Sequence, residues 1–205
     1  MNSNANYLNK SSDLLKRKIL KFYRDDPTNI EKMADIVNKN TIYSLRILEW
    51  FCNNYSKKKN IIYTIPGKTD FNVYLSYKAH LDSYQKKKFD PFKRDHQGYA
   101  KFNIYYDNKG QVWDDPSLIK TKKVSVIETT VGQLNFLKWC IENNILEYVK
   151  KNINAIKLDM NNSINYTNSK TTAGEKKERK KRQSLSVSAT RTCIKRFTSV
   201  NMTFK

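Results

Sequence analysis

Three aspartates and a lysine near the middle of the chain have the spacing that metal-assisted chemistry could use. Asp107 and Lys109 follow an apolar run, and Asp90 and Asp95 precede it. Nucleases that use Mg²⁺ place acids and a lysine near a strand hairpin, where they hold the metal and activate water. The tetrapeptide Asp107-Asn-Lys-Gly110 is also typical of a simple turn, and this interpretation is favoured because the lysine lies beyond the strand. We therefore expect no enzyme and no catalytic residue, with a Mg-dependent nuclease kept as a third candidate function.

The histidines and cysteines offer little support for another site. They are His80, His96, Cys52, Cys140 and Cys193. No pair has the Cys-x-x-Cys or His-x-x-x-His spacing that zinc sites use, and no glycine-rich phosphate loop is present. Cys52 and Cys140 fall on apolar helical stripes, where a cysteine acts as a small apolar side chain. We expect no metal, no cofactor and a reducing compartment.

Basic residues give the strongest functional signal. The 205 residues include 39 Lys and Arg against 19 Asp and Glu, a formal charge of +20. Residues 170–205 hold 11 of the basic residues and two of the acidic ones. A chain this basic is expected to bind a polyanion, most simply DNA or RNA. The candidate nucleic-acid-binding residues form two clusters, Lys86, Lys87, Lys88, Lys93 and Arg94, and Lys176, Lys177, Arg179, Lys180, Lys181 and Arg182.

Each cluster has an alternative interpretation. The second cluster could bind phosphates through counterion release, act as a nuclear import signal, or be a solvated spacer. The first is interleaved with aromatic residues, which suits stacking on single-stranded bases. The aromatic residues could instead anchor the loop in the core, and Phe89-Asp-Pro-Phe92 favours that packed turn.

The apolar spacing predicts helices in the first third of the chain. One runs from Ser12 to the Asp25-Asp26-Pro27 break, a second starts at Thr28 with a Thr-x-x-Glu capping box, and a third covers about 41–55. The short joint between the last two permits a helix-turn-helix interpretation, and a packing role is favoured over it.

Strand signals follow from residue 60. Residues 61–65 and 71–75 flank Pro66-Gly67 and predict a hairpin, 77–88 predict a helix, and 101–106, 111–113 and 124–127 predict further strands. Thr130 opens the clearest helix, which continues to about residue 149. The fold class is therefore α+β, with N-terminal helices, a small and mainly antiparallel sheet backed by a helix, and a basic C-terminal arm.

The composition predicts four segments. Residues 1–11 are a flexible N-terminus, 12–158 the α+β domain, 159–183 a polar and basic linker, and 184–205 a basic, strand-like arm with period-two alternation. No signal peptide or apolar run of spanning length is present, so a soluble, intracellular protein without a membrane span is expected.

Four stretches together resemble a known family. They are Ser44-Leu-Arg-Ile-Leu-Glu-Trp-Phe51 with Asn54-Tyr-Ser-Lys-Lys58, Phe89-Asp-Pro-Phe-Lys-Arg94, Thr129-Thr-Val-Gly-Gln-Leu-Asn-Phe136, and Arg179-Lys-Lys-Arg-Gln-Ser-Leu-Ser-Val-Ser-Ala-Thr190. In this order they resemble an uncharacterised family of the nucleocytoplasmic large DNA viruses, of the mimivirus and phycodnavirus sort. The family pattern has a cysteine where this chain has Lys93. The motifs carry no assigned catalytic role, so no site residue is transferred.

The leading hypothesis is a non-enzymatic nucleic-acid-binding protein of a large DNA virus, acting in transcription, genome handling or packaging. The alternative is a structural capsid or core protein whose basic arm contacts other virion proteins. The resemblance implies a place in the virion or in the viral factory of the host cytoplasm.

Overall fold

The computed structural model describes residues 3–39, 41–67, 70–84, 88–92, 101–119 and 123–172, with side chains placed between residues 13 and 163. The chain divides into two compact units, 1–164 and 165–205, and of the second only the helical residues 165–172 are described. The predicted α+β class is confirmed. In order, the elements are α1 (Ser3–Asp25), α2 (Pro27–Val37), α3 (Leu45–Trp50), the π-helix η1 (Phe51–Tyr55), α4 (Ser56–Lys59), β1 (Ile62–Thr64), β2 (Asp70–Asn72), α5 (Val73–Tyr84), β3 (Lys101–Tyr106), β4 (Val112–Trp113), the 3₁₀ helix η3 (Pro116–Leu118), β5 (Ser125–Thr130), α6 (Val131–Glu142), α7 (Ile145–Lys151) and α8 (Ile153–Thr172).

The N-terminal helices form where predicted, with different ends. Helix α1 begins at Ser3, so most of the segment expected to be flexible is helical; it contains no glycine or proline to stop the helix. Helix α2 is capped by Asp26, whose side chain accepts from the Thr28 N–H at 2.9 Å, and not by Thr28. Pro27 suits the first helical position because its missing N–H needs no partner there. The connection to α3 covers residues 38–44, and the helical run that begins with α3 continues through η1 and α4 to Lys59. A connection this long disfavours the helix-turn-helix interpretation, whose turn has three or four residues.

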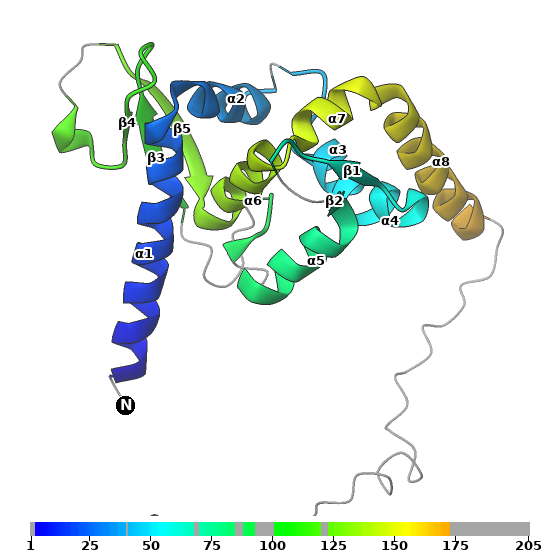
Figure 1. Cartoon of the computed structure of the whole chain (residues 1–205), viewed down its shortest axis with the longest axis horizontal. Helices are drawn as coiled ribbons and strands as arrows, with labels where there is room; N and C mark the ends of the chain where they lie inside the picture. The colour runs from blue at the N-terminus through cyan, green and yellow to red at the C-terminus, as the bar shows by residue number, and fades with distance from the viewer. Residues whose placement is uncertain are drawn as a thin grey trace, which may run out of the picture. The chain divides into compact units, whose positions relative to one another are not determined.

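Helix α6 lies at the centre of the first unit, between the sheet and the group formed by α3, α4 and α5 (Figure 1). Its first turn is capped as predicted, by the Thr130 hydroxyl, which accepts from the Gln133 N–H. A helix packed against neighbours on most of its sides buries residues all round its circumference. Buried residues accordingly occur on every side of α6: Gly132, Gln133, Leu134, Asn135, Phe136, Leu137, Trp139 and Cys140.

The cysteines of this core are structural. Cys52 in η1 and Cys140 in α6 are both fully buried. Burial raises the pKa of the Cys52 thiol well above its usual value, so its thiolate is scarce at neutral pH. A nucleophilic role for Cys52 is thus disfavoured. Among the described residues no group of His, Cys, Asp or Glu is arranged to hold a metal ion.

The three-stranded sheet is antiparallel, in the order β4-β3-β5. β3 pairs with β5 along its whole length, from Lys101 opposite Thr130 to Tyr106 opposite Ser125. The predicted hairpin forms separately as β1 and β2. Helix α1 covers one face of the larger sheet, where the Lys16 Nζ lies 4.3 Å from the centroid of the Phe102 ring. Ile104 and Ile127 are buried on that same face.

Helix α8 replaces the first part of the predicted linker. It continues to Thr172, so residues 159–172 are helical although their composition is polar. Ile156 is buried, and the Asp159 carboxylate accepts from Trp50 Nε1 at 3.2 Å and from Lys58 Nζ at 2.5 Å. The helix is anchored by these few contacts, which a compositional argument cannot detect. Residues 173–183 and the predicted arm 184–205 lie outside the described residues.

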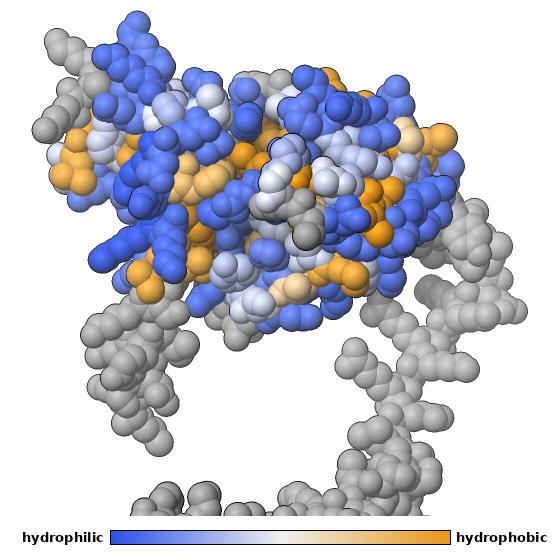
Figure 2. Space-filling model, viewed as in Figure 1, coloured by the Kyte–Doolittle hydropathy of each residue, from blue (hydrophilic) through white to orange (hydrophobic). Residues whose placement is uncertain are grey.

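The surface is mainly hydrophilic on the side seen in Figure 2, with apolar residues in separate patches. Exposed large apolar side chains are scattered over different elements: Leu14, Ile42, Ile62, Leu75, Leu118, Val126 and Leu158. Within the described residues, no helix combines the length and the apolar character needed to cross a bilayer.

Candidate nucleic-acid interface

The loop of residues 88–92, which belongs to the first predicted basic cluster, is held in place by α6. Gln133 Nε2 donates to the Pro91 carbonyl at 2.9 Å, and Asn135 Nδ2 donates to the Lys88 carbonyl at 2.9 Å. The Thr129 hydroxyl in turn donates to Gln133 Oε1 at 2.9 Å, which fixes the amide. Gln133 and Asn135 thus supply hydrogen-bond partners to the backbone of the loop in a place from which water is excluded.

The aromatic residues around this loop belong to the core. Phe89 is fully buried and packs against Phe136 and Trp139 with ring centroids 5.7 Å apart in both pairs. Tyr77 is 4% exposed and contacts the same rings. Neither residue can offer its face to a base, so the packed-turn interpretation holds for both.

Most of the predicted basic residues fall outside the described residues. Of the two clusters, the structure describes Lys88, which is partly buried and whose carbonyl is held by α6. The others lie outside the described ranges: Lys86, Lys87, Lys93, Arg94, Lys176, Lys177, Arg179, Lys180, Lys181 and Arg182. The binding roles of both clusters stay predictions.

A row of side chains that sequence reasoning missed crosses the outer face of the sheet. Trp113 in β4 is opposite Tyr105 in β3, and Tyr105 is opposite Val126 in β5. Directly paired residues share a face, and the alternation along β3 places this row opposite to Phe102 and Ile104. The two aromatic residues are partly exposed and Val126 is 53% exposed. We call Trp113, Tyr105 and Val126 the outer row.

Polar residues border the outer row on the same face. Asn103 is opposite Glu128, and Lys101 is two residues before Asn103. The Lys101 Nζ lies 3.9 Å from a Glu128 carboxylate oxygen, and their side chains are 31% and 54% exposed. A partly aromatic sheet face with polar neighbours is the arrangement on which several protein modules stack unpaired bases.

Strand β4 is fastened to α1 through Asp114, the residue after Trp113. The carboxylate lies 3.1 Å from Lys16 Nζ and 2.9 Å from an Arg24 guanidinium nitrogen. Arg24 Nε also donates to the Val112 carbonyl at 3.0 Å. Burial alone would raise the pKa of Asp114, but the hydrogen bond from Lys16 and the charges of Lys16 and Arg24 outweigh it and lower the pKa. This ion cluster holds β4, and with it the residue next to Trp113, against α1.

We expect Asp114→Asn to lower the free energy of unfolding by about 1 kcal/mol at neutral pH, because it removes the charge from a partly exposed ion cluster. The folded-state pKa of Asp114 is depressed, so its stabilisation is present above the unfolded pKa near 4 and is lost as pH falls below it. Urea titrations at pH 7 and pH 3 measure this. The difference between variant and parent should shrink at pH 3, and a constant difference would contradict the role of the charge.

Asp107 closes the β3–β4 turn. Its Oδ1 accepts from the Lys109 N–H at 3.0 Å and the Gln111 N–H at 2.9 Å, and the Gly110 N–H donates to its carbonyl. Gly110 has φ +75°, and a Cβ there would run into Pro27. These contacts account for the Asp107-Asn-Lys-Gly110 tetrapeptide as a turn. Asp95 of the nuclease interpretation lies outside the described residues.

Comparison with known proteins identifies the family of this chain but indicates no activity. Residues 1–184 match a family described as a "Family of unknown function (DUF7197)". An uncharacterized protein of Acanthamoeba polyphaga mimivirus is 37% identical over 143 residues, which are 68% of this chain and 50% of that protein. The chain thus spans about half the length of the curated relative it matches. No solved structure matches.

Proposed function

The chain belongs to the family of unknown function that its residues 1–184 match, and we propose that it is a non-enzymatic protein that binds single-stranded nucleic acid. The sequence resemblance links this family to giant DNA viruses. The task of the protein would be genome handling, transcription or packaging. The outer row is the observation that supports this proposal most, because it is a partly exposed aromatic surface on a hydrogen-bonded sheet.

The aromatic surface of the outer row suits the unpaired bases of a single strand better than the paired bases of a duplex. Every base has a π face, so stacking on Trp113 and Tyr105 requires no particular sequence but does require that the bases are unpaired. Lys101 and Glu128 bring opposite charges to this face, so the row itself supplies little net attraction for phosphates. Phosphate attraction would come from the net charge of +20, of which residues 170–205 carry +9.

A salt titration of binding tests the proposal. Affinities of the full chain for single-stranded DNA, RNA and duplex DNA are measured between low and physiological salt. We expect single strands to bind more tightly than duplex at every salt concentration, because only they can stack on the outer row. Equal or tighter binding of duplex would contradict base stacking as the mode of binding.

Removal of residues 170–205 separates stacking from charge. We expect the shortened chain to bind more weakly and with a lower slope of log K against log salt, each lost phosphate contact removing about 0.7 from the slope for a single strand. The preference for single strands over duplex should survive the deletion. A structural virion protein would instead show poor affinity for every free nucleic acid.

A further inference from the structure

A hollow of about 520 Å³ opens where β3 ends and β5 begins, and it is separate from the outer row. It is lined by Tyr106, Asp107, Asn108, Lys123, Val124 and Ser125. Tyr106 is opposite Ser125 in the ladder, so the hollow lies at the end of the sheet on the face opposite to Tyr105 and Val126. Its size is in the range of small-ligand sites.

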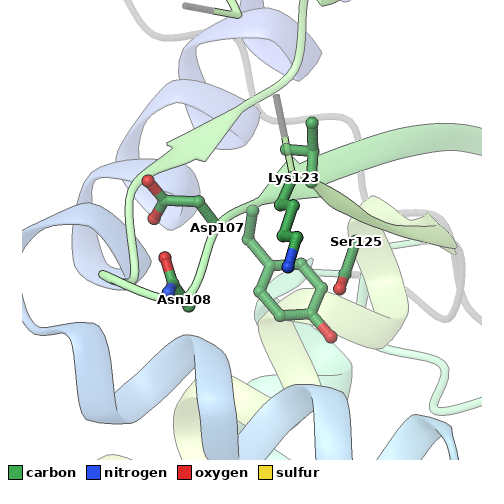
Figure 3. Close-up of a pocket in the computed structure, with 6 residues that line it drawn as sticks. Asp107, Asn108, Lys123 and Ser125 are labelled. Atoms are coloured by element: carbon green, nitrogen blue, oxygen red, sulfur yellow. The ribbon is translucent and has the colours of Figure 1, made fainter. Parts of the chain in front are cut away.

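The hollow contains a cation and neutral donors. Lys123, Ser125 and Asn108 are all exposed. The Lys123 and Ser125 side chains lie together on one side of the hollow, away from the Asp107 carboxylate (Figure 3). Lys123 forms none of the ion pairs found among the described residues, which involve Lys16, Arg24, Lys58, Lys101 and Lys138. Asn108 lies on the Asp107 side of the hollow (Figure 3). The Lys123 ammonium group beside the Ser125 hydroxyl is a donor pair that phosphate oxygens accept from well.

Among the described residues that line the hollow, Asp107 is the one negative group, and its orientation decides whether an anion can bind there. In Figure 3 its carboxylate points back toward its own turn. Oδ1 is occupied by two backbone N–H groups, and Oδ2 is buried with no hydrogen-bond partner among the described residues. Asp107 is 5% exposed, so it presents little surface to a ligand, although its charge still opposes an anion nearby.

We propose that this hollow binds a phosphate group, with Lys123 supplying the charge and Ser125 supplying a hydrogen bond. The ligand class is a phosphate mono- or diester, which a nucleotide and a nucleic-acid backbone both contain. The site goes beyond the proposed function, since it needs no stacking by Trp113 or Tyr105. A phosphate bound here would also pair the charge of Lys123, which has no ion-pair partner among the described residues.

Three single-charge variants of the full chain test the site. Inorganic phosphate is titrated at constant ionic strength, and the amide resonances of Asn108 and Ser125 report binding. Lys123→Gln should weaken saturable binding at least about tenfold, because it removes a charge-assisted hydrogen bond. Lys109→Gln is the matched control: it removes the same charge from an exposed turn residue outside the lining, and we expect less than about a twofold change.

Asp107→Asn should change the affinity for phosphate in the direction opposite to Lys123→Gln. Asparagine keeps an oxygen for the two N–H groups of the turn but removes the charge that opposes an anion, so phosphate binding should strengthen a few-fold. Weaker phosphate binding in this variant, equal losses in Lys123→Gln and Lys109→Gln, or no saturable binding by the parent chain would each overturn the proposal. Thermal melting checks that each variant is folded.

A competition measurement assigns the source of the phosphate. A single-stranded oligonucleotide that displaces inorganic phosphate from the parent chain, and does so equally in a Trp113→Leu variant, identifies a backbone phosphate as the ligand. If a mononucleotide displaces phosphate and the oligonucleotide does not, the ligand is a free phosphate ester. Both results support the site, and neither depends on the outer row.

Discussion

Replacing Trp113 and Tyr105 together by alanine is expected to weaken binding of a single-stranded oligonucleotide at least tenfold at physiological salt. Stacking of one base on an aromatic side chain contributes about 1–3 kcal/mol, and the double variant removes both rings of the outer row. Duplex DNA should bind the variant and the parent with similar affinity, because a duplex has no unpaired base to stack. Fluorescence anisotropy with labelled single-stranded and duplex oligonucleotides of equal length measures both values.

A matched control separates stacking from general loss of aromatic surface. Tyr74 is also partly exposed, but it lies in α5, where Lys57 Nζ is 5.3 Å from its ring centroid. Tyr74→Ala should change the affinity for single strands by less than about twofold. Replacing Trp113 and Tyr105 by leucine retains apolar volume on the sheet and guards against simple unfolding of β4. Parent-like affinity in the leucine variant would show that rings are not needed.

Gln133→Ala is expected to reduce the free energy of unfolding by about 2–4 kcal/mol, because the lost amide leaves buried polar groups without partners. The Pro91 carbonyl and the Thr129 hydroxyl both lose a hydrogen bond, and Gln133 itself is 1% exposed. The loop 88–92 would lose one of its two side-chain anchors on α6. Urea denaturation followed by circular dichroism gives the change in stability.

Two further variants calibrate that result. Gln111→Ala removes the same side chain from an exposed position and should change stability by less than about 0.5 kcal/mol. Thr129→Val removes only the hydroxyl that donates to Gln133 Oε1, and we expect an intermediate loss of about 1 kcal/mol. A Gln133→Ala variant as stable as Gln111→Ala would contradict the anchoring role of Gln133.

These contacts connect two of the stretches that carry the family resemblance. Phe89-Asp-Pro-Phe92 and Thr129 to Phe136 are about 40 residues apart in sequence, yet the second holds the first by the Gln133–Pro91 hydrogen bond and by ring contacts of Phe136. Asn135 adds a hydrogen bond to Lys88, the residue just before the first stretch. The shared pattern in these stretches therefore reflects, at least in part, the construction of the core. It follows that resemblance in these residues does not by itself indicate a binding site.

Local signals in the sequence were enough to predict much of the fold. The Thr130 cap, the β1–β2 hairpin and the turn at Asp107 were all recognised from residue types and spacing. The end of α8 could not be predicted in this way, because Asp159 holds that helix through Trp50 and Lys58, which are more than 100 residues away in sequence. The Asp26 cap was missed because the capping box at Thr28 offered a competing local pattern.

The outer row could not be found from alternation alone. The period-two pattern of residues 101–106 places Tyr105 opposite to Phe102 and Ile104, but it does not say which face α1 covers. Trp113 joins Tyr105 only through the register of β4, which the turn at 107–110 sets. The polar residues Gln133 and Asn135 on an apolar helix were a visible signal for the loop contact, since buried amides need partners.

Photo-cross-linking maps most directly where a single strand binds. An oligonucleotide with 4-thiothymidine is irradiated with the full chain, and the tryptic peptides that carry nucleotide are identified by mass spectrometry. Binding at the outer row predicts cross-links in the peptides Phe102–Lys109 and Gly110–Lys120, which contain Tyr105 and Trp113. Cross-links found only in peptides from residues 170–205, with none in these two, would contradict the claim that the sheet face holds the bases.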